Sequence, residues 1–487
     1  MTPQLLGWAL VVGLGGVVVC VGWLSLPWPL IHDAPILHYV AWRISQGAVP
    51  YRDLFDMNFP GAYLLHLLVL KTLGAGDAAW RLFDLLWLGL TSLLVAALAR
   101  PWGRIAAFGG ALFFAAYHLG GGAWQAGQRD FLLCPFLLAG ALGVARWWER
   151  RGGRALPWAG LALGAGVTIK PQAALLALAL LLLVLAAPAR AGGSRWPAAA
   201  MLVGGLVLAP LALASWLATI GGLGAWREIV VDYLLPLYSR LGGPASWTVY
   251  RWSPWPAIAI VLALSIGHAA VWRRLTFRHV VALTGAGTGL LHYVGQGKGW
   301  EYHLYPLAAF AAVLLFSEVA AVLGARRVVF GAPLVAALAI LVVLLGRSGA
   351  VNADANWIWD KERLVRILTA DLGGWRRPGD LVQVLDTTGG GVHALLRLGL
   401  VEPTRFLYDF HFFHDTDHPV IRALRAELVA GLDLSPPRFI VLFRRGWPSG
   451  REERINGFPE LARLLAERYL IAVGREDYVI YAKRDGS

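Results

Sequence analysis

Residues 5–26 read LLGWALVVGLGGVVVCVGWLSL, a stretch without a single charged side chain. The hydrocarbon core of a bilayer is about 30 Å thick, and a helix of roughly 20 apolar residues crosses it. The stretch therefore predicts a membrane-spanning helix. Residues 1–4 lack the basic side chains of a cleavable signal peptide, so we expect this helix to be retained as the first span.

Similar apolar runs follow along the chain. We place them at residues 79–99, 104–119, 130–147, 156–170, 172–188, 197–219, 256–271, 279–294, 303–323 and 328–346. Together with 5–26 they predict a polytopic α-helical membrane protein with about eleven transmembrane helices. The run 60–74 is short and contains His66 and Lys71. Counting it as a crossing would break the charge pattern of the loops, so we expect a re-entrant or surface helix there.

Arginine clusters occupy every second loop of this arrangement. They are Arg100 and Arg104; Arg146, Arg150, Arg151 and Arg154; Arg190 and Arg195; Arg273, Arg274 and Arg278; and Arg326 and Arg327. Because arginine-rich loops stay in the cytoplasm, the N-terminus is expected inside and the C-terminus outside. The formal charge of +13 is divided among these clusters and forms no continuous basic face. A nucleic-acid partner is therefore not expected.

The composition divides the chain into two parts. Hydrophobic residues make up 57% of the chain and charged residues 15%, whereas average soluble proteins contain about 25% charged residues. The apolar excess ends near Leu345. We therefore predict a transmembrane domain at 1–346 and a water-soluble domain at 347–487. Cys20 and Cys134 each lie in an apolar run, which argues against a disulfide or a thiolate metal site.

Strand-like and helical runs alternate in the C-terminal part. Strands are expected at 381–385, 439–443, 469–473 and 478–482, and helices at 393–398, 420–430 and 458–467. This pattern predicts a small extracytoplasmic α/β domain. The glycine turn at 388–391 lacks the full phosphate-binding pattern, so a nucleotide site is not expected there.

The loops on the outer side contain most of the polar and aromatic residues. They are the first outer loop at 27–78, the turn at 120–129, the loop at 221–255 and the segment 295–302. Four different loops on one face suggest a shared site. A transporter would more often show similarly broken segments in two related halves, and we find no such repeat.

The first outer loop contains HDAPILHYVAWR at 32–43 and GAVPYRDLFDMNFP at 47–60. Asp33 directly follows the first span, where an unpaired carboxylate is costly to desolvate and ionisable groups tend to be functional. Asp33 is thus a candidate base. The alternative is that Asp33 caps the amphipathic helix expected at 34–45, since aspartate is a favoured N-cap residue.

These segments resemble the membrane glycosyltransferases of the C-type fold, and especially the bacterial branch related to protein O-mannosyltransferases and to the lipid A aminoarabinose transferase. The resemblance depends on an ordered series: Asp33, the segment 47–56, Gln128-Arg129-Asp130, the turn 168–171 and the run 302–306. It implies an inverting transfer of a sugar, a hexose or a pentose, from a polyprenyl-phosphate carrier to an acceptor hydroxyl on the outer face. Asp33 would then be the general base.

The resemblance also suggests roles for further residues. Asp130 would orient the acceptor or a sugar hydroxyl, although Arg129 and Asp130 could simply form an ion pair at a helix start. Candidates for the donor phosphate are Lys298, His303, Arg52 and Lys170, and candidates for substrate positioning are Tyr51, Asn58, Arg129 and Tyr302. Lys298 could instead belong to an interfacial anchor. Many relatives have a Lys-Pro pair just before the proline-led run, whereas this chain reads Asp56-Met57-Asn58-Phe59-Pro60 there. Asn58 can donate a hydrogen bond but carries no charge.

Metal binding is not expected. The segment 411–418 is rich in His and Asp but has no recognised ligand spacing, and a divalent cation remains the weaker alternative. The expected partners are a polyprenyl-phosphate-sugar donor, a glycan, lipid or protein acceptor, and membrane lipids. We expect a multi-pass protein of the bacterial cytoplasmic membrane whose active site faces the periplasm. A transporter or flippase of lipid-linked glycans and a non-catalytic assembly subunit are the alternative functions.

Overall fold

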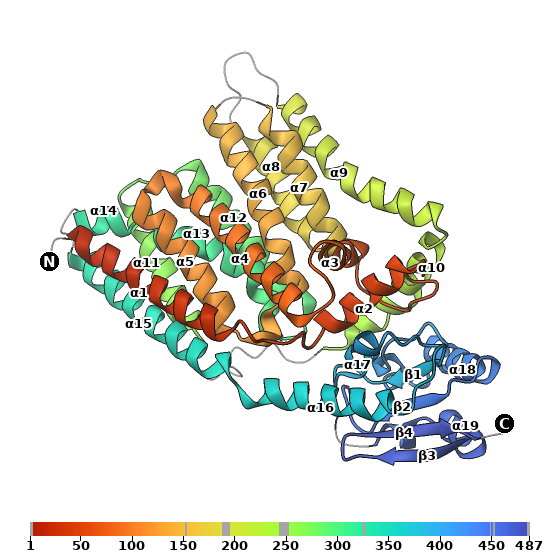
Figure 1. The fold of residues 1–487 in the computed structure, drawn as a ribbon. Helices are drawn as coiled ribbons and strands as arrows, with labels where there is room; N and C mark the ends of the chain where they lie inside the picture. The colour runs from red at the N-terminus through yellow and green to blue at the C-terminus, as the bar shows by residue number, and fades with distance from the viewer. Residues whose placement is uncertain are drawn as a thin grey trace.

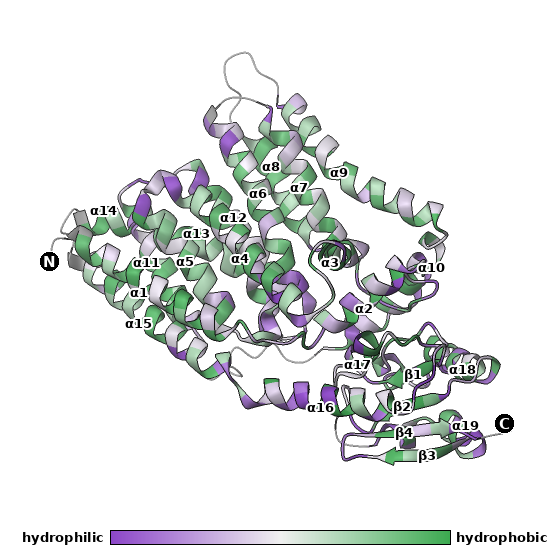
Figure 2. Ribbon diagram, viewed as in Figure 1, coloured by the Kyte–Doolittle hydropathy of each residue, from purple (hydrophilic) through white to green (hydrophobic). Residues whose placement is uncertain are grey.

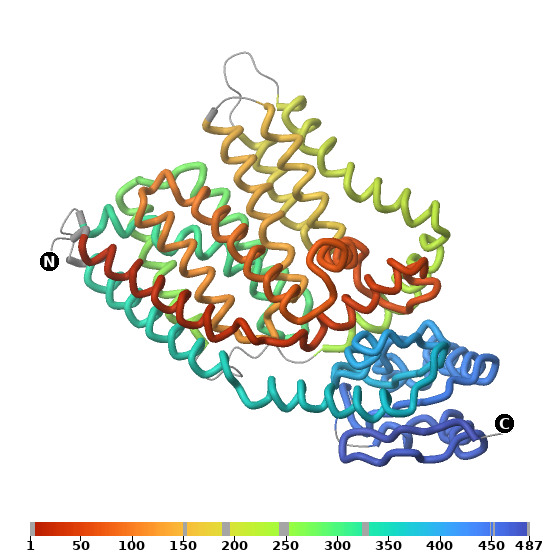
Figure 3. The backbone as a smooth tube through the Cα atoms, viewed as in Figure 1, coloured from red at the N-terminus to blue at the C-terminus, as the bar shows by residue number. Residues whose placement is uncertain are grey.

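A bundle of helices and a smaller α/β domain make up the protein (Figure 1). The computed structural model describes residues 3–150, 153–187, 195–242, 253–324, 328–448, 450 and 453–484. The α/β domain lies at one end of the bundle, and the first outer loop lies beside it (Figures 1 and 3).

The helices of the bundle follow the predicted apolar runs. They are α1 (Pro3–Leu24), α4 (Asp77–Ala99), α5 (Arg104–Gly120), α6 (Arg129–Arg150), α7 (Ala155–Ile169), α8 (Ala173–Ala186), α9 (Trp196–Thr219), α11 (Trp255–Val271), α12 (Phe277–Gln296), α13 (Tyr305–Leu315), α14 (Val319–Gly324) and α15 (Val328–Ala353). Among the described residues, six segments are helical, long and apolar enough to cross a membrane: Leu5–Leu24, Asp77–Trp102, Arg129–Glu149, Trp196–Thr219, Glu301–Leu323 and Gly331–Gly373. Helices α7, α8 and α11 are shorter but also apolar. The total of eleven spans stays a prediction.

The predicted run 303–323 falls within the candidate span Glu301–Leu323, but its helix is interrupted, because α13 ends at Leu315 and α14 begins at Val319. Glu318 lies in the break and is buried. Its carboxylate is 2.7 Å from Nδ1 of His268 and 3.1 Å from Nε of Arg274. A polar group at this depth needs such partners, and the break brings the carboxylate to them.

Glycines allow α7 and α9 to pack with their backbones in contact. A Cβ atom added at Gly160 would collide with the carbonyl oxygen of Leu202, and one added at Gly205 would collide with the carbonyl oxygen of Pro157. Small residues at helix crossings are typical of membrane bundles, where close van der Waals packing replaces the hydrophobic effect.

The helix ends on the predicted cytoplasmic side meet around Arg278, at the start of α12. Its guanidinium pairs with Glu149 near the end of α6 and donates to the carbonyl oxygens of Ala97 and Leu98 at the end of α4. Hydrophilic residues gather at the ends of the bundle helices, whereas the helices themselves are mainly hydrophobic (Figure 2). The predicted clusters at Arg151, Arg190, Arg326 and Arg327 lie outside the described residues.

The first outer loop forms two short helices, α2 (Ala34–Ser45) and α3 (Pro60–Thr72). Helix α2 has the predicted bounds. The 13 residues of α3 are about 20 Å long at 1.5 Å per residue, which is too short to cross a bilayer. The imidazoles of His66 on α3 and His38 on α2 are hydrogen-bonded at 3.0 Å between their Nδ1 atoms, so the two helices are joined by polar groups away from solvent. Between α9 and α11 lies α10 (Leu223–Glu228), which continues as a π-helical turn at Ile229–Leu234.

Two helices connect the bundle to the α/β domain. Helix α15 continues past the predicted domain boundary at 346 as far as Ala353, and α16 (Asn356–Gly373) follows. The remaining elements are β1 (Val382–Leu385), α17 (Gly391–Leu398), α18 (Pro419–Leu434), β2 (Phe439–Phe443), α19 (Pro459–Arg468), β3 (Tyr469–Gly474) and β4 (Tyr478–Lys483). The described strands form one sheet in the order β1-β2-β4-β3, with β1 parallel to β2 and the other pairs antiparallel. Strands β1 and β2 are buried throughout, as their uninterrupted apolar character requires.

The α/β domain is held against the first outer loop by direct contacts. The backbone N–H of Phe55 donates to the carbonyl of Arg405 at 2.6 Å, and the hydroxyl of Tyr39 donates to the carbonyl of Leu400 at 3.2 Å. Arg397 on α17 pairs with Asp77 at the start of α4 at 2.9 Å. These contacts fix the domain over the outer end of the bundle and create the cavity described next.

Candidate active site

A cavity of about 320 Å³ lies between the α/β domain and the end of the bundle on which this domain packs. Seven of the residues proposed from the sequence line it: Asp33, Asn58, Arg129, Lys170, Lys298, Tyr302 and His303. They come from the first outer loop, the start of α6, the α7–α8 turn and the segment between α12 and α13. Residues 270 positions apart in the sequence, Asp33 and His303, thus line one cavity.

Asp33 precedes α2 but does not cap it, because its side chain makes no capping hydrogen bond. The carboxylate lies 3.6 Å from Nδ1 of His32, and about a quarter of each side chain is exposed to the cavity side. Partial burial raises the pKa of the Asp33 carboxyl, but His32, Arg129 and Gln128 more than offset this effect, so the pKa lies below its ordinary value. Asp33 is therefore an ionised carboxylate at neutral pH. His32 itself has a left-handed backbone, with φ of 62°, a strained conformation of the kind found at functional sites.

Asp130 lies beneath the cavity and is fully buried. Its two carboxylate oxygens accept hydrogen bonds from Nζ of Lys170 at 2.6 and 2.8 Å, and Nε2 of His292 on α12 is its second partner. The described residues contain no ion pair between Arg129 and Asp130, so the simple helix-start pair considered above is not formed. Sequence reasoning missed His292, although an imidazole within a predicted span was a signal for it.

Arg129 lines the cavity and has one buried nitrogen without a hydrogen-bond partner among the described residues. One guanidinium nitrogen binds Oδ1 of Asn58, whereas Nε is buried and has no hydrogen-bond partner among the described residues. The backbone carbonyl of Asn58 accepts hydrogen bonds from the hydroxyls of Tyr51 at 2.7 Å and Tyr63 at 3.0 Å. Tyr51 is itself buried and does not line the cavity. Its hydrogen bond therefore positions Asn58 without contact between Tyr51 and the cavity.

Lys298 and His303, from the segment between α12 and α13, also line the cavity. The ammonium of Lys298 donates to the carbonyl of Tyr238 at 2.7 Å and to that of Leu241, and it lies 4.1 Å from the centre of the Tyr238 ring. Burial lowers the pKa of Lys298 to about 8. Nδ1 of His303 is buried without a partner in the described part of the chain, as is Nε2 of the neighbouring Gln296. Unpaired buried donors are costly, so these atoms suit a ligand that accepts hydrogen bonds.

Arg52 does not reach the cavity. Its side chain is 56% exposed and pairs with the adjacent Asp53 at 2.7 Å. Its placement therefore gives no support to the expected contact with a donor phosphate. Tyr302, by contrast, lines the cavity, and its ring lies 5.8 Å from that of Trp124.

The α/β domain forms part of the cavity wall, which the sequence did not reveal. Thr387 and Thr388 after β1, together with Tyr408, Phe410 and Trp447, line it. No local motif marks these residues, because only the docking of the domain brings them to the membrane face.

The segment rich in histidine and aspartate packs as part of this interface. His411 is buried, with its ring centre 4.9 Å from that of Phe55 and 4.2 Å from that of Phe412. Nε2 of His414 lies 2.9 Å from the hydroxyl of Tyr233. Among the described residues, no group of three or more His, Cys, Asp or Glu side chains is arranged to hold a metal ion.

In the glycine turn of the α/β domain, a carboxylate of the chain itself occupies the backbone N–H donors. The backbone N–H groups of Gly389, Gly390 and Gly391 donate to the carboxylate of Asp386 at 2.8, 2.8 and 2.9 Å. Gly390 has φ of 119°, and a Cβ at Gly391 would collide with Val384, so this turn requires glycine. The donors that could have bound a nucleotide phosphate are thus used within the domain.

Comparison with known proteins agrees with this arrangement. Residues 59–216 match the profile of a family described as dolichyl-phosphate-mannose-protein mannosyltransferase. The fold is similar to that of ArnT from Cupriavidus metallidurans bound to undecaprenyl phosphate, with a TM-score of 0.61 and 12% identity over 99% of this chain and 98% of that one. For the apo state of ArnT the TM-score is 0.60 at 12% identity, over 98% of each chain. No curated protein sequence matches the chain significantly. The chain therefore has the C-type fold of the membrane glycosyltransferases that are related to protein O-mannosyltransferases.

Proposed function

We propose that the protein is an inverting glycosyltransferase that moves a sugar from a polyprenyl-phosphate carrier to an acceptor hydroxyl on the outer face of the membrane. The observation that carries this proposal is one cavity that contains an ionised carboxylate, Asp33, and three cations, Arg129, Lys170 and Lys298. Intramembrane or interfacial charges are costly and are usually retained for function.

The cations suit the phosphate of the donor. Asp130 balances the charge of Lys170, which leaves Arg129 and Lys298 opposite the single carboxylate of Asp33. The unpartnered nitrogens Nε of Arg129 and Nε2 of Gln296 are donors suited to phosphate oxygens. ArnT has been observed with undecaprenyl phosphate bound, which supports a carrier of the same class for this chain.

The proposed transfer uses the Asp33 carboxylate and the cations of the cavity. The Asp33 carboxylate takes the proton of the acceptor hydroxyl while the hydroxyl oxygen forms a bond to the anomeric carbon. The bond from that carbon to the phosphate oxygen breaks, and its electron pair leaves with the phosphate, which the cations stabilise. Attack opposite the phosphate inverts the anomeric centre. Asp130 does not line the cavity and acts through Lys170, so we assign it as a positioning residue.

We further propose that the protein is located in the bacterial cytoplasmic membrane, with this cavity open to the periplasm, and that transfer does not require a metal ion. Helices of this length and hydropathy support a multi-pass membrane protein. Chelation with EDTA should leave transfer unchanged if this is correct, and a loss restored by Mg²⁺ or Mn²⁺ would contradict it.

The test is transfer by the purified protein in liposomes. A panel of undecaprenyl-phosphate hexoses and pentoses is offered with carbohydrate, lipid and peptide acceptors, and products are detected by mass spectrometry. We expect transfer from at least one donor, with inversion, and none from Asp33→Asn at an unchanged melting temperature. Movement of a lipid-linked glycan across the membrane without any transfer would favour the transporter alternative. Normal complementation by Asp33→Asn in cells would favour a non-catalytic subunit.

A further inference from the structure

Asp56 is a buried acidic residue that the proposed transfer does not use. Its side chain is 1% exposed, and it does not line the cavity. A carboxyl group is costly to remove from water unless its oxygens find partners. Oδ1 of Asp56 accepts a hydrogen bond from the backbone N–H of Asn58 at 2.7 Å. The carboxyl group therefore closes the turn at residues 56–58, as aspartate side chains often do two residues ahead of a backbone N–H.

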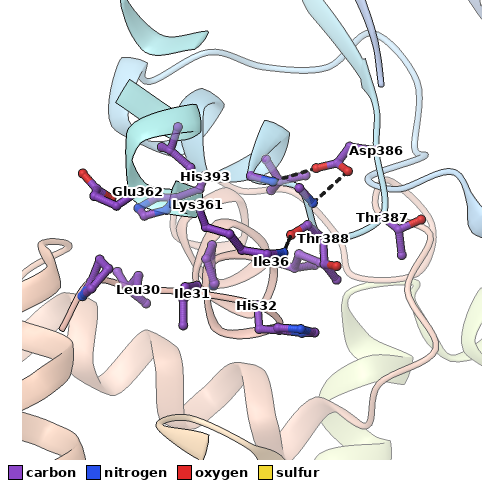
Figure 4. A pocket seen from close by; sticks show the side chains of 16 residues that line it. Leu30, Ile31, His32, Ile36, Lys361, Glu362, Asp386, Thr387, Thr388 and His393 are labelled. Atoms are coloured by element: carbon purple, nitrogen blue, oxygen red, sulfur yellow. Dashed lines mark hydrogen bonds between the residues drawn. The ribbon is translucent and has the colours of Figure 1, made fainter. Parts of the chain in front are cut away.

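An aspartate orders a second turn beside the cavity in the same way. In the α/β domain, the carboxylate of Asp386 accepts hydrogen bonds from the backbone N–H groups of the glycine turn at 389–391 (Figure 4). The two threonines that follow Asp386 line the cavity, and so do Met57 and Asn58 in the first outer loop. In both places, an aspartate outside the cavity fixes neighbouring residues that line it.

Both backbone polar groups of Asn58 are held in place. Its N–H group is bonded to the carboxyl group described above, and its carbonyl oxygen accepts hydrogen bonds from the hydroxyls of Tyr51 at 2.7 Å and Tyr63 at 3.0 Å. The α/β domain contacts the same turn, because the backbone N–H of Met57 lies 3.4 Å from the hydroxyl of Tyr408. The side chain of Asn58 therefore extends from a backbone with little freedom to move.

The carboxamide of Asn58 connects this turn to the start of α6. Its Oδ1 atom accepts a hydrogen bond from the guanidinium of Arg129. A free arginine side chain has many rotamers, and a fixed acceptor selects those that keep the guanidinium at the cavity. Because the carboxamide is neutral, it orients the guanidinium and leaves its positive charge available to a phosphate.

We propose that Asp56 is a positioning residue for donor binding, because it fixes the turn at 56–58 from which the Asn58 carboxamide holds the Arg129 guanidinium at the cavity. The inference rests on the proposed function, in which Arg129 binds the donor phosphate. Asp56 does not line the cavity and acts through Asn58. Removal of its carboxyl group should therefore weaken donor binding and leave the base in place.

Donor binding can be measured without turnover, by isothermal titration of undecaprenyl phosphate into the full-length protein in detergent. Asp56→Ala removes the acceptor and should raise the Kd about three- to ten-fold, the effect of one lost hydrogen bond. Asp56→Asn retains an oxygen that can accept the same N–H, so the Kd should stay within about two-fold of the wild-type value. The matched control is Asp53→Ala, which removes a carboxylate that accepts the backbone N–H of Val49 at 2.8 Å in the same loop and should leave the Kd unchanged.

A double-mutant cycle tests whether Asp56 acts through Arg129. Arg129→Gln and Asp56→Ala are measured singly and together. In the Arg129→Gln background, Asp56→Ala should raise the Kd by less than about two-fold, because residues that act through one interaction are not additive. If Asp56 contributed only to the stability of the loop, the same substitution would raise the Kd by equal factors with and without Arg129. Asp56→Ser is a milder second variant for the cycle if Asp56→Ala does not fold, since a hydroxyl accepts such a bond more weakly.

Turnover separates positioning from loss of the base. With the active donor, Asp56→Ala should raise the donor KM by the same factor as the Kd and leave kcat and the acceptor KM within about two-fold. Unchanged donor affinity in Asp56→Ala, equal factors in the two backgrounds of the cycle, or weak binding by Asp56→Asn would overturn this inference and leave the glycosyltransferase assignment intact. A wild-type protein that neither binds undecaprenyl phosphate nor transfers any sugar would instead refute the proposed function.

Discussion

The ammonium of Lys170 lies 2.6 and 2.8 Å from the two carboxylate oxygens of Asp130, although the residues are 40 positions apart in the chain. Both side chains are buried, at 6% and 0% exposure. The pair joins the α7–α8 turn to the start of α6. The pair therefore fixes the position of the Lys170 ammonium, one of the cations of the cavity.

Breaking this pair should destabilise the protein. Asp130→Asn leaves the Lys170 ammonium buried without a counter-charge, which costs about 3–5 kcal/mol in comparable buried pairs. The double variant Asp130→Asn, Lys170→Met should regain much of that stability but not the activity. Thermal unfolding in detergent measures the first effect and transfer the second. Asp53→Asn, which removes an exposed ion pair with Arg52, is the matched control and should change stability by about 1 kcal/mol or less. If Asp130→Asn alone were as stable as the wild type, a structural role for the pair would be contradicted.

Asp33→Asn should reduce kcat by about 10²–10⁴-fold, the usual contribution of a general base. The amide keeps the shape of the side chain but cannot take a proton. Donor binding should change little, because the cations remain. The control is again Asp53→Asn, whose carboxylate belongs to the same loop but does not line the cavity. If Asp33→Asn lost less than about two-fold in kcat, another base would have to be sought.

Arg129→Gln should weaken the binding of the polyprenyl-phosphate donor and leave the Asp33 carboxylate in place. A hydrogen bond to a charged group contributes about 1.5–3 kcal/mol, so the donor KM should rise about ten- to 100-fold. Isothermal titration with undecaprenyl phosphate alone reports the same loss as a higher Kd. Arg227→Gln, at an exposed arginine of α10 outside the cavity, controls for a general loss of charge at the membrane surface. Equal effects of the two substitutions would argue against a phosphate site at Arg129.

We expect kcat/KM to change little as the pH is lowered and to decline as the pH is raised into the alkaline range. The pKa of Asp33 lies below its ordinary value, so the base stays deprotonated and activity persists down to about pH 4. Burial lowers the pKa of Lys298 to about 8, so its ammonium loses its charge as the pH rises through that value, and donor binding weakens. Lys298→Arg should make this alkaline decline less steep, because a permanent cation replaces the titrating group. A profile that is flat to pH 10 would contradict the role of Lys298.

Local sequence was sufficient for most elements and for the choice of Asp33 as the candidate base. The apolar runs predicted the bundle helices because hydrophobic length is a local property. Helix α2 begins after Asp33 and ends at Ser45 as its amphipathic pattern indicated, and β2 occupies 439–443 as predicted. Asp33 could be singled out because its position directly after the first span is visible in the sequence alone.

The partners of these residues could not be read from the sequence, because each is supplied by a distant segment. Nothing in the local pattern distinguishes Lys170, which pairs with Asp130, from a lysine that extends toward the lipid surface. Arg52 looked as suitable for a phosphate as Arg129, yet Asp53 binds it at the surface.

The amino-acid sequence by itself determined that the chain spans a membrane, that an α/β domain follows the last span and that Asp33 stands at the interface, since all three depend on the order and hydropathy of neighbouring residues. Only the tertiary structure decided which cations share the cavity with Asp33 and which part of its wall the α/β domain supplies. Those relations depend on the packing of helices and on the contacts that hold the α/β domain to the first outer loop, and such long-range contacts leave no periodic signal in the chain.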